Sequence, residues 1–264
     1  MRGKRAHENL HAPSFVLQCF YMENGIIDYF GELYYKCFAT KLEQRSEQEA
    51  RLALKLLDSP RSILDVGCGW GRHLHYFLRW GLDAWGVEPN PFFVQIFKER
   101  NPLWSNRIIH NKLQNLNVFK QFSAVVSLWT SIGWDQSDQE EQELFRKLSE
   151  FLSPGGLLLL DVDNLKGWQA RFCRKWWERV DGGYVLDQHA LKGSKLTTTR
   201  QFLLDAGSTY KVTRQLKLYT LEDLQALAEP YQLFLRATYR DLSGNPFYPE
   251  APRIVAVFEK ITAA

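Results

Sequence analysis

Residues 62–71 read Ser-Ile-Leu-Asp-Val-Gly-Cys-Gly-Trp-Gly, a short apolar segment that runs into a glycine-rich turn and then into a helical pattern. The apolar residues are typical of a central parallel strand, which is covered on both faces. Glycines at alternate positions leave the turn free of side chains, so its backbone N–H groups can approach a ligand at the helix N-terminus. Asp65, just before the turn, is placed to order this loop.

Helices and strands alternate on both sides of this stretch. A helix over 42–57 precedes it. After it we predict a helix over 71–80, a strand over 83–87 ending at Glu88, a helix over 92–100, strands over 106–110 and 122–128, a helix over 138–152, a turn at 153–156 and a strand over 157–160. This alternation implies an α/β fold with a doubly wound, mostly parallel sheet of Rossmann-like type. Ligands of such sheets bind outside the carboxyl ends of the strands.

The pattern changes after residue 164. Alternating segments over 184–189, 197–204 and 210–219 predict an antiparallel β insert before the last helix. That helix begins at Thr220 in a capping box, and strands over 232–240 and 253–260 bring the core sheet to seven strands. We divide the chain into an N-terminal helical or lid segment at 1–41, a ligand-binding core at 42–164, an insert that covers the substrate or forms an interface at 165–219, and the completion of the core sheet at 220–264.

The composition predicts an ordinary soluble protein. A net charge of +3 over 264 residues is too small to indicate a nucleic-acid partner. The four cysteines stand far apart and form no Cys-x-x-Cys pair, which favours free thiols in a reducing compartment. No apolar run reaches the roughly 20 residues that span a bilayer, and the N-terminus has no secretory pattern. We therefore expect a cytoplasmic location, no membrane and no metal site.

The glycine spacing separates two classes of nucleotide-binding turn. The dinucleotide fingerprint Gly-x-Gly-x-x-Gly has its third glycine at the sixth position, where helix and strand pack closely. Here the sixth position is Arg72, and the third glycine is Gly71. A nicotinamide cofactor, and with it an NAD(P)-dependent oxidoreductase, therefore fits the sequence poorly and is kept as the alternative enzyme class.

In order and spacing, these segments resemble the class I S-adenosylmethionine-dependent methyltransferases over roughly residues 28–260. The stretch 63–71 resembles their first motif, 122–128 their fourth strand and 152–156 the turn before the fifth. The resemblance implies S-adenosyl-L-methionine as cofactor and a carboxylate at Glu88 that accepts both ribose hydroxyls, which is sound chemistry for an ionised acid. It assigns cofactor binding to Asp65, Gly67, Cys68, Gly69, Gly71, Glu88, Asn111, Leu113 and Leu128.

The sequence departs from the family after the third strand. Members commonly carry there an acid for the adenine amino group and then an apolar residue, whereas this chain has Asn111-Lys112-Leu113. Leu113 can keep the apolar contact, but Lys112 cannot accept a hydrogen bond. Adenine recognition then falls to Asn111, to backbone groups or to no specific group.

Residues 128–134 and the insert resemble methyltransferases of small molecules, including those acting on amino sugars and related amines. An insert over the strand ends would close the crevice and exclude water. We therefore predict methyl transfer to a nitrogen or oxygen of a small molecule, with a possible homo-oligomer through the insert. A non-catalytic S-adenosylmethionine-binding partner protein is the third hypothesis. Candidate substrate residues are Tyr29, Tyr34, Trp134, Asp241 and Tyr248.

The sequence identifies no catalytic base. Methyl transfer needs alignment of the nucleophile and, at most, removal of one proton. Tyr248 and His189 are weak candidates, and for His189 the structural interpretation is an exposed or hydrogen-bonded strand histidine. Trp176 and Trp177 are interpreted as core or interface residues, and Cys68 as a small packing residue.

Overall fold

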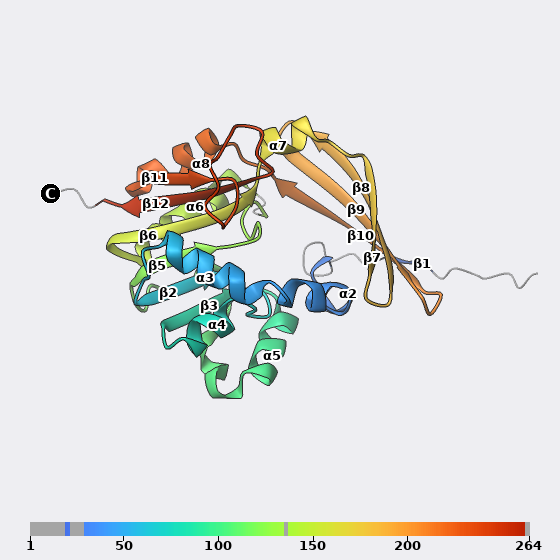
Figure 1. Cartoon of the computed structure of the whole chain (residues 1–264), viewed down its shortest axis with the longest axis horizontal. Helices are drawn as coiled ribbons and strands as arrows, with labels where there is room; N and C mark the ends of the chain where they lie inside the picture. The colour runs from blue at the N-terminus through green and yellow to red at the C-terminus, as the bar shows by residue number, and fades with distance from the viewer. Residues whose placement is uncertain (1–18, 22–28, 135–136, 262–264) are drawn as a thin grey trace, which may run out of the picture.

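The computed structural model describes residues 19–21, 29–134 and 137–261, and its central feature is a seven-stranded sheet (Figure 1). The strands follow the order β11-β12-β6-β5-β2-β3-β4, and β12 runs antiparallel to both of its neighbours. The strands are β2 (Ser62–Val66), β3 (Asp83–Glu88), β4 (Ile108–His110), β5 (Phe122–Ser127), β6 (Leu152–Asp163), β11 (Leu233–Tyr239) and β12 (Arg253–Lys260). This confirms the predicted doubly wound, mostly parallel sheet.

Two apolar layers cover the sheet because successive side chains of each strand point to opposite faces. In β5, Val125 joins one layer, whereas Ala124 and Val126 join the other, and all three are fully buried. Helices α3 (Ser46–Leu56), α4 (Leu74–Arg79) and α5 (Pro91–Arg100) supply one layer, and α6 (Asp138–Glu150) and α8 (Leu221–Ala228) supply the other. Each fully buried Val or Leu contributes roughly 1.5–3 kcal/mol.

The insert forms a separate sheet, as predicted. It begins with α7 (Leu165–Ala170) and continues as the antiparallel strands β7 (Lys175–Val180), β8 (Gly183–Lys192), β9 (Lys195–Leu204) and β10 (Thr209–Lys217). β1 (Cys19–Tyr21) pairs in parallel with β10. Figure 1 shows this sheet beside the end of α2 (Glu32–Glu43). An apolar cluster that includes Phe38, Trp70 and Phe202 joins α2, the glycine turn and the insert.

Some local predictions differ from the structure. The helix after the glycine turn begins at Leu74 instead of residue 71, because Gly71 has φ +74°, outside the helical region. Residues 153–156, expected as a turn, form an irregularity inside β6, where the register with β5 shifts between the pairs of Leu152 and Leu157. The sequence pattern also missed β7, which carries Trp176 and Trp177.

The other predicted elements are present with shifted ends: the helix predicted over 42–57 is found as α3, which begins at Ser46, and the strand predicted over 106–110 as β4, which begins at Ile108. Thr220 and Asp223 make the reciprocal capping box of α8. The described connections include the 3₁₀ turns η1 (Pro102–Arg107), η2 (Leu113–Asn115) and η3 (Glu229–Tyr231). Among the described residues, no helix has the length and apolarity needed to cross a bilayer. The N-terminal segment predicted at 1–41 lies outside the described residues at 1–18 and 22–28.

Candidate active site

A cavity of about 310 Å³ opens at the carboxyl ends of β2, β3 and β5. The chain leaves β2 for β3 and β4 on one side and later returns to β5 and β6 on the other, so the cavity lies where the strand order reverses. Of the nine residues assigned to a cofactor from sequence, eight line it: Asp65, Gly67, Cys68, Gly69, Glu88, Asn111, Leu113 and Leu128. Gly71 does not.

Two glycines of the turn lie directly against side chains from other segments of the chain. A Cβ on Gly67 would lie 2.5 Å from the Ser131 Cβ, and one on Gly71 would lie 2.1 Å from the Phe97 ring. Both residues also have positive φ. The prediction that the turn is open to a ligand therefore needs correction at these two positions, where glycine is required by packing and backbone conformation.

The N–H groups of the turn are largely occupied. Those of Gly67 and Cys68 donate to the Val87 carbonyl at 2.8 and 3.2 Å. The Gly69 N–H donates to Glu88 Oε2 at 2.8 Å. The turn is thus fastened to the end of β3, which fixes the position of the acid relative to the glycines. Cys68 packs under it as a buried free thiol beside Gly86, as predicted.

Glu88 is a buried acid whose two oxygens each accept one backbone hydrogen bond. Oε2 accepts from Gly69 and Oε1 accepts from Asn90, both at 2.8 Å. Burial raises the pKa of Glu88 to about 7, although these two bonds oppose the shift. Since each carboxylate oxygen has further acceptor capacity, Glu88 can also receive hydroxyl donors from the cavity.

Asp65 is 2% exposed, and its Oδ2 has no hydrogen-bond partner in the described structure. Burial raises its pKa to about 7, the Arg72 charge opposes the shift and the Glu88 charge adds to it. A buried acceptor without a donor is unfavourable. Its place in the cavity lining fits a ligand that supplies hydrogen-bond donors or positive charge.

The segment after β4 forms another wall. Leu113 is 2% exposed and offers an apolar surface. The Asn111 side-chain oxygen accepts from the Lys112 N–H at 2.9 Å and so closes the local turn. Lys112 points its ammonium toward Glu140, 3.9 Å away. Gln114, which the sequence reasoning missed, also lines the cavity and carries a side-chain amide.

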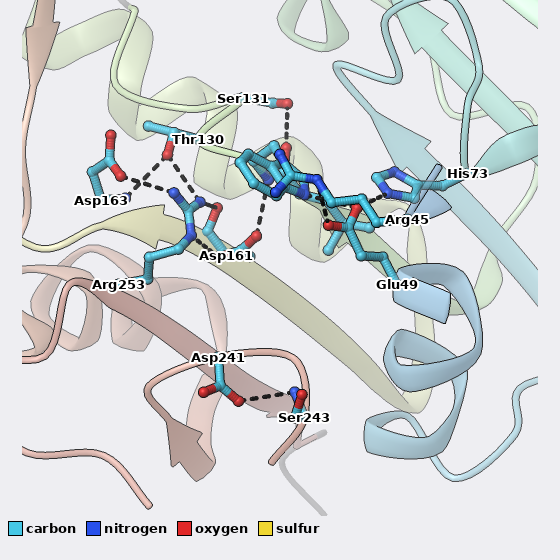
Figure 2. Close-up of polar contacts among 12 residues, drawn as sticks. Arg45, Glu49, His73, Thr130, Ser131, Asp161, Asp163, Asp241, Ser243 and Arg253 are labelled. Carbon is cyan, nitrogen blue, oxygen red and sulfur yellow. Dashed lines mark hydrogen bonds and ion pairs between the residues drawn. The ribbon is translucent and has the colours of Figure 1, made fainter. Parts of the chain in front are cut away.

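The loop after β5 has an unusual backbone that is held by long-range contacts (Figure 2). Trp129 and Thr130 are consecutive non-glycine residues with φ +57° and +59°. Asp161 accepts from the Trp129 N–H at 3.1 Å, and its carbonyl accepts from the Thr130 N–H at 2.8 Å. Arg253 donates to the Asp161 carboxylate and to the Thr130 hydroxyl.

Charged residues surround the Trp129 indole. The guanidinium carbons of Arg45, Arg72 and Arg253 lie 4.0, 5.2 and 5.1 Å from its ring centroid. The indole N–H donates to Glu49 Oε2 at 3.0 Å. Sequence reasoning missed this cluster, because its members come from α3, the glycine turn, β5 and β12.

Glu49 is the centre of that cluster (Figure 2). Burial alone would raise its pKa, but hydrogen bonds from His73 and Arg72 and the Arg72 charge lower the pKa of Glu49 to about 2. Burial, together with the Arg72 charge, lowers the pKa of His73 to about 4. His73 lines the cavity as a neutral ring at 2.9 Å from Glu49.

One wall of the cavity is aromatic. Phe30, Tyr34 and Trp134 line it, and the rings of Phe30 and Trp134 meet edge to face at 5.4 Å. Two of the five predicted substrate residues, Tyr34 and Trp134, are therefore in the lining. Tyr29 is not, but its ring packs against Phe30 at 5.0 Å.

The other sequence candidates lie outside the cavity lining. The Asp241 carboxylate closes its own loop by accepting from Ser243 and Asn245 (Figure 2). Tyr248 is 40% exposed in the loop between β11 and β12. His189 is buried in β8, with Nδ1 3.1 Å from the Thr198 hydroxyl. The geometry agrees with the structural interpretation of His189, and neither Tyr248 nor His189 is a lining residue of the cavity. No cluster of three or more His, Cys, Asp or Glu in the described residues has the geometry of a metal site.

Comparisons with known proteins identify the domain that contains most of this cavity. Residues 63–156 match the model of a family described as "Methyltransferase domain". The dTDP-3-amino-3,4,6-trideoxy-alpha-D-glucopyranose N,N-dimethyltransferase of Streptomyces venezuelae is 30% identical over 101 residues, which are 38% of this chain and 41% of that protein. The tRNA U34 carboxymethyltransferase of Idiomarina loihiensis is 29% identical over 134 residues, 47% of this chain and 40% of that protein.

The chain thus spans less than half the length of these two curated relatives. A solved structure extends the likeness of fold. The CcbJ methyltransferase from Streptomyces caelestis superimposes with a TM-score of 0.73 and 18% identity, covering 83% of this chain and 90% of that one. The likeness includes the part of the chain beyond residue 156, which the family model does not reach.

Proposed function

Residues 63–156 match a methyltransferase domain, and on that premise we propose that the protein is a class I S-adenosylmethionine-dependent methyltransferase that transfers a methyl group to a nitrogen or oxygen of a small molecule. The observation that carries the proposal is the junction of β2 and β3, where Glu88 both fixes the glycine turn and borders the cavity.

The donor set of the cavity fits this cofactor. Glu88 would accept the ribose hydroxyls, and Leu113 and Leu128 would pack against apolar parts of the molecule. Asp65, with its partnerless Oδ2, suits the cationic or N–H-bearing end of the methionine moiety. When bound, the cofactor supplies an activated methyl group at a sulfonium.

The chain's own residues then align the acceptor and exclude water. Phe30, Tyr34 and Trp134 form the wall where the acceptor would lie, and the insert packs behind them through α2. His73 is kept neutral by burial and by the neighbouring Arg72 charge, which together lower its pKa to about 4 although Glu49 opposes the shift. An amine acceptor that arrives neutral needs only alignment, so the reaction requires no dedicated base from Tyr248 or His189.

A small amine is the favoured acceptor class. The Streptomyces venezuelae relative is named for the amine of a nucleotide-linked sugar, and the aromatic wall of this chain suits a ring-shaped acceptor. The net charge of +3 supports a small-molecule acceptor over a nucleic acid, whose backbone would require a basic surface. A cytoplasmic location accords with a soluble acceptor and a free thiol at Cys68.

Calorimetry with S-adenosylhomocysteine tests the cofactor assignment. We expect the pure protein to bind it and Glu88→Ala to weaken binding by at least about tenfold, since charge-assisted hydrogen bonds contribute about 1.5–3 kcal/mol each. Glu47→Ala, which removes an exposed acid on α3, is the control and should leave affinity unchanged. Absence of binding, or equal binding by Glu88→Ala, would refute the proposal.

The two alternatives predict other results. An oxidoreductase would give a fluorescence change on titration with NADH, which we do not expect. Arg72, at the position of the third fingerprint glycine, has its guanidinium fixed by Ser46 and Glu49. A non-catalytic partner protein would bind S-adenosylhomocysteine but methylate no amine in a broad acceptor screen.

A further inference from the structure

Arg214, on β10 of the insert, is a cation without an anionic partner among the described residues. Within the described structure its guanidinium forms no ion pair and no hydrogen bond, and its Nε is buried without a partner. Its surroundings are aromatic: the guanidinium carbon lies 4.3 Å from the ring centroid of Tyr29, 5.1 Å from that of Trp134 and 5.8 Å from that of Phe30. A half-buried guanidinium in such a place lacks most of the hydrogen bonds that water would give it.

Arg200, on the adjacent strand β9, is an arginine whose charge is paired within the same sheet. It also stacks on Tyr29, at 4.7 Å, but its fork donates to both oxygens of Asp187 at 2.8 and 2.7 Å. The charge of Arg200 is therefore compensated within the protein. Arg214 has no such carboxylate among the described residues, which indicates that its anionic partner is not one of them.

Arg214 does not itself line the cavity, but it contacts two residues that do. Phe30 and Trp134, two of the three rings it contacts, are lining residues. The third ring belongs to Tyr29, which is 1% exposed and whose hydroxyl has no hydrogen-bond partner in the described structure. Two polar groups that lack partners thus lie behind one wall of the cavity.

We propose that the methyl acceptor carries an anionic oxygen group, a carboxylate or a phosphate, and that Arg214 binds this group at the acceptor end of the cavity, with the Tyr29 hydroxyl as a second donor. The inference rests on the proposed methyltransferase function and narrows its substrate class. A guanidinium fork matches either anion through two parallel N–H donors.

The same arrangement argues against a cationic group beside Trp134. An aromatic ring can attract an ammonium ion, but Arg214 already faces this one, 5.1 Å from its centroid. A second cation there would meet a like charge at short range. The guanidinium instead favours the neutral form of a nearby amine, which is the form that can accept a methyl group.

Anion binding to protein saturated with S-adenosylhomocysteine tests the proposal, with inorganic phosphate and acetate titrated separately by calorimetry. We expect one or both to bind the wild-type protein, and Arg214→Met to weaken that binding by at least about tenfold. Arg214→Lys should be intermediate because it keeps the charge and loses the fork. Arg179→Met, which removes an exposed arginine of β7 paired with Asp205, is the matched control.

S-adenosylhomocysteine affinity and the far-ultraviolet circular dichroism of each variant are measured first. A wild-type protein that does not bind S-adenosylhomocysteine contradicts the proposed function, whereas the present inference fails if the cofactor product binds and neither anion does. Equal anion affinity in wild type and Arg214→Met would overturn it as well. If Arg214→Met does not fold, the comparison of wild type with Arg214→Lys decides, and equal affinity there overturns the inference.

Discussion

Asp65 and Glu88 are two carboxylic acids buried at the same end of the sheet, and their burial has a cost. The pKa of each is raised to about 7, so each is half ionised near neutral pH. An acid whose pKa is higher in the folded than in the unfolded state stabilises the fold when protonated. Stability is therefore lost as pH rises from the ordinary value of the acid to about 7. When ionised, these two buried acids lower the stability of the fold, which is expected of groups that bind a ligand.

Asp65→Asn should stabilise the ligand-free protein at pH 8.5. The substitution removes a buried charge. The raised pKa of Asp65 corresponds to a destabilisation of about 4 kcal/mol at most. We therefore expect the free energy of unfolding to rise by an amount on the order of 2–3 kcal/mol, or roughly 5–10 °C in Tm. At pH 5.5 the wild-type acid is already protonated, so the gain should shrink to within about 1 kcal/mol. Thermal unfolding at both pH values measures this difference. The control is Asp58→Asn at an exposed ion pair, and a gain independent of pH would contradict the argument.

At the scale of elements, the part of the cavity wall formed by Trp129 and Thr130 depends on contacts of β6 and β12 with the loop after β5. Two consecutive left-handed residues cost on the order of 1–2 kcal/mol each and persist only where neighbours fix them. Asp161 and Arg253 supply those neighbours through bonds that join residues 32 to 123 positions apart. β6 and β12 together thus set the conformation of Trp129 and Thr130.

Arg253→Met should strongly destabilise the protein. It leaves the Asp161 carboxylate, 2% exposed, without its cation, and breaking a buried pair in this way costs about 3–5 kcal/mol. Urea unfolding would measure the loss. Adding Asp161→Asn to the variant should recover part of it, because the unpaired charge is gone while an acceptor for the Trp129 N–H remains. Arg236→Met, at an exposed pair, should cost less than about 1 kcal/mol. Equal losses in the two single variants would contradict this account.

At the scale of the molecule, the chain consists of a seven-stranded core and an insert sheet joined at one place. Asn164 and Tyr219, which flank the insert, pair with each other as a β-bridge. The insert therefore leaves and rejoins the core at one point while α2 and its apolar cluster hold it over the cavity side. Its outer edge is β7, where Trp176 and Trp177 are 44% and 65% exposed. This exposure excludes the interpretation of Trp176 and Trp177 as core residues and leaves their interpretation as interface residues.

An exposed edge strand with large aromatic residues favours pairing with a second copy of the chain. We expect light scattering to give about twice the chain mass of 30.8 kDa, and Trp177→Glu to lower it to the single-chain value. The control is Phe234→Glu, at a 40% exposed ring on β11, the edge of the other sheet. A wild-type protein of single-chain mass, or a dimer that survives Trp177→Glu, would rule out this interface.

What the sequence alone determined is the cofactor end of the cavity. The strand, the glycine turn and Glu88 lie within 27 residues, so local periodicity and spacing were enough to predict their arrangement. The same held for the two-layer core, because the alternation of side chains along a strand follows from backbone geometry. The turn itself was understood only in part, since Ser131 and Phe97, which make glycine necessary there, come from other elements.

Only the tertiary structure decided which residues form the aromatic wall of the cavity. It placed Tyr34 and Trp134 in the lining, left Asp241, Tyr248 and His189 outside it, and brought Arg214 within 6 Å of Phe30 and Trp134. No spacing along the chain predicts these contacts, because they join β10 of the insert, the start of α2 and the loop after β5. Side chains from distant segments meet only once burial of the apolar clusters has fixed how the two sheets pack.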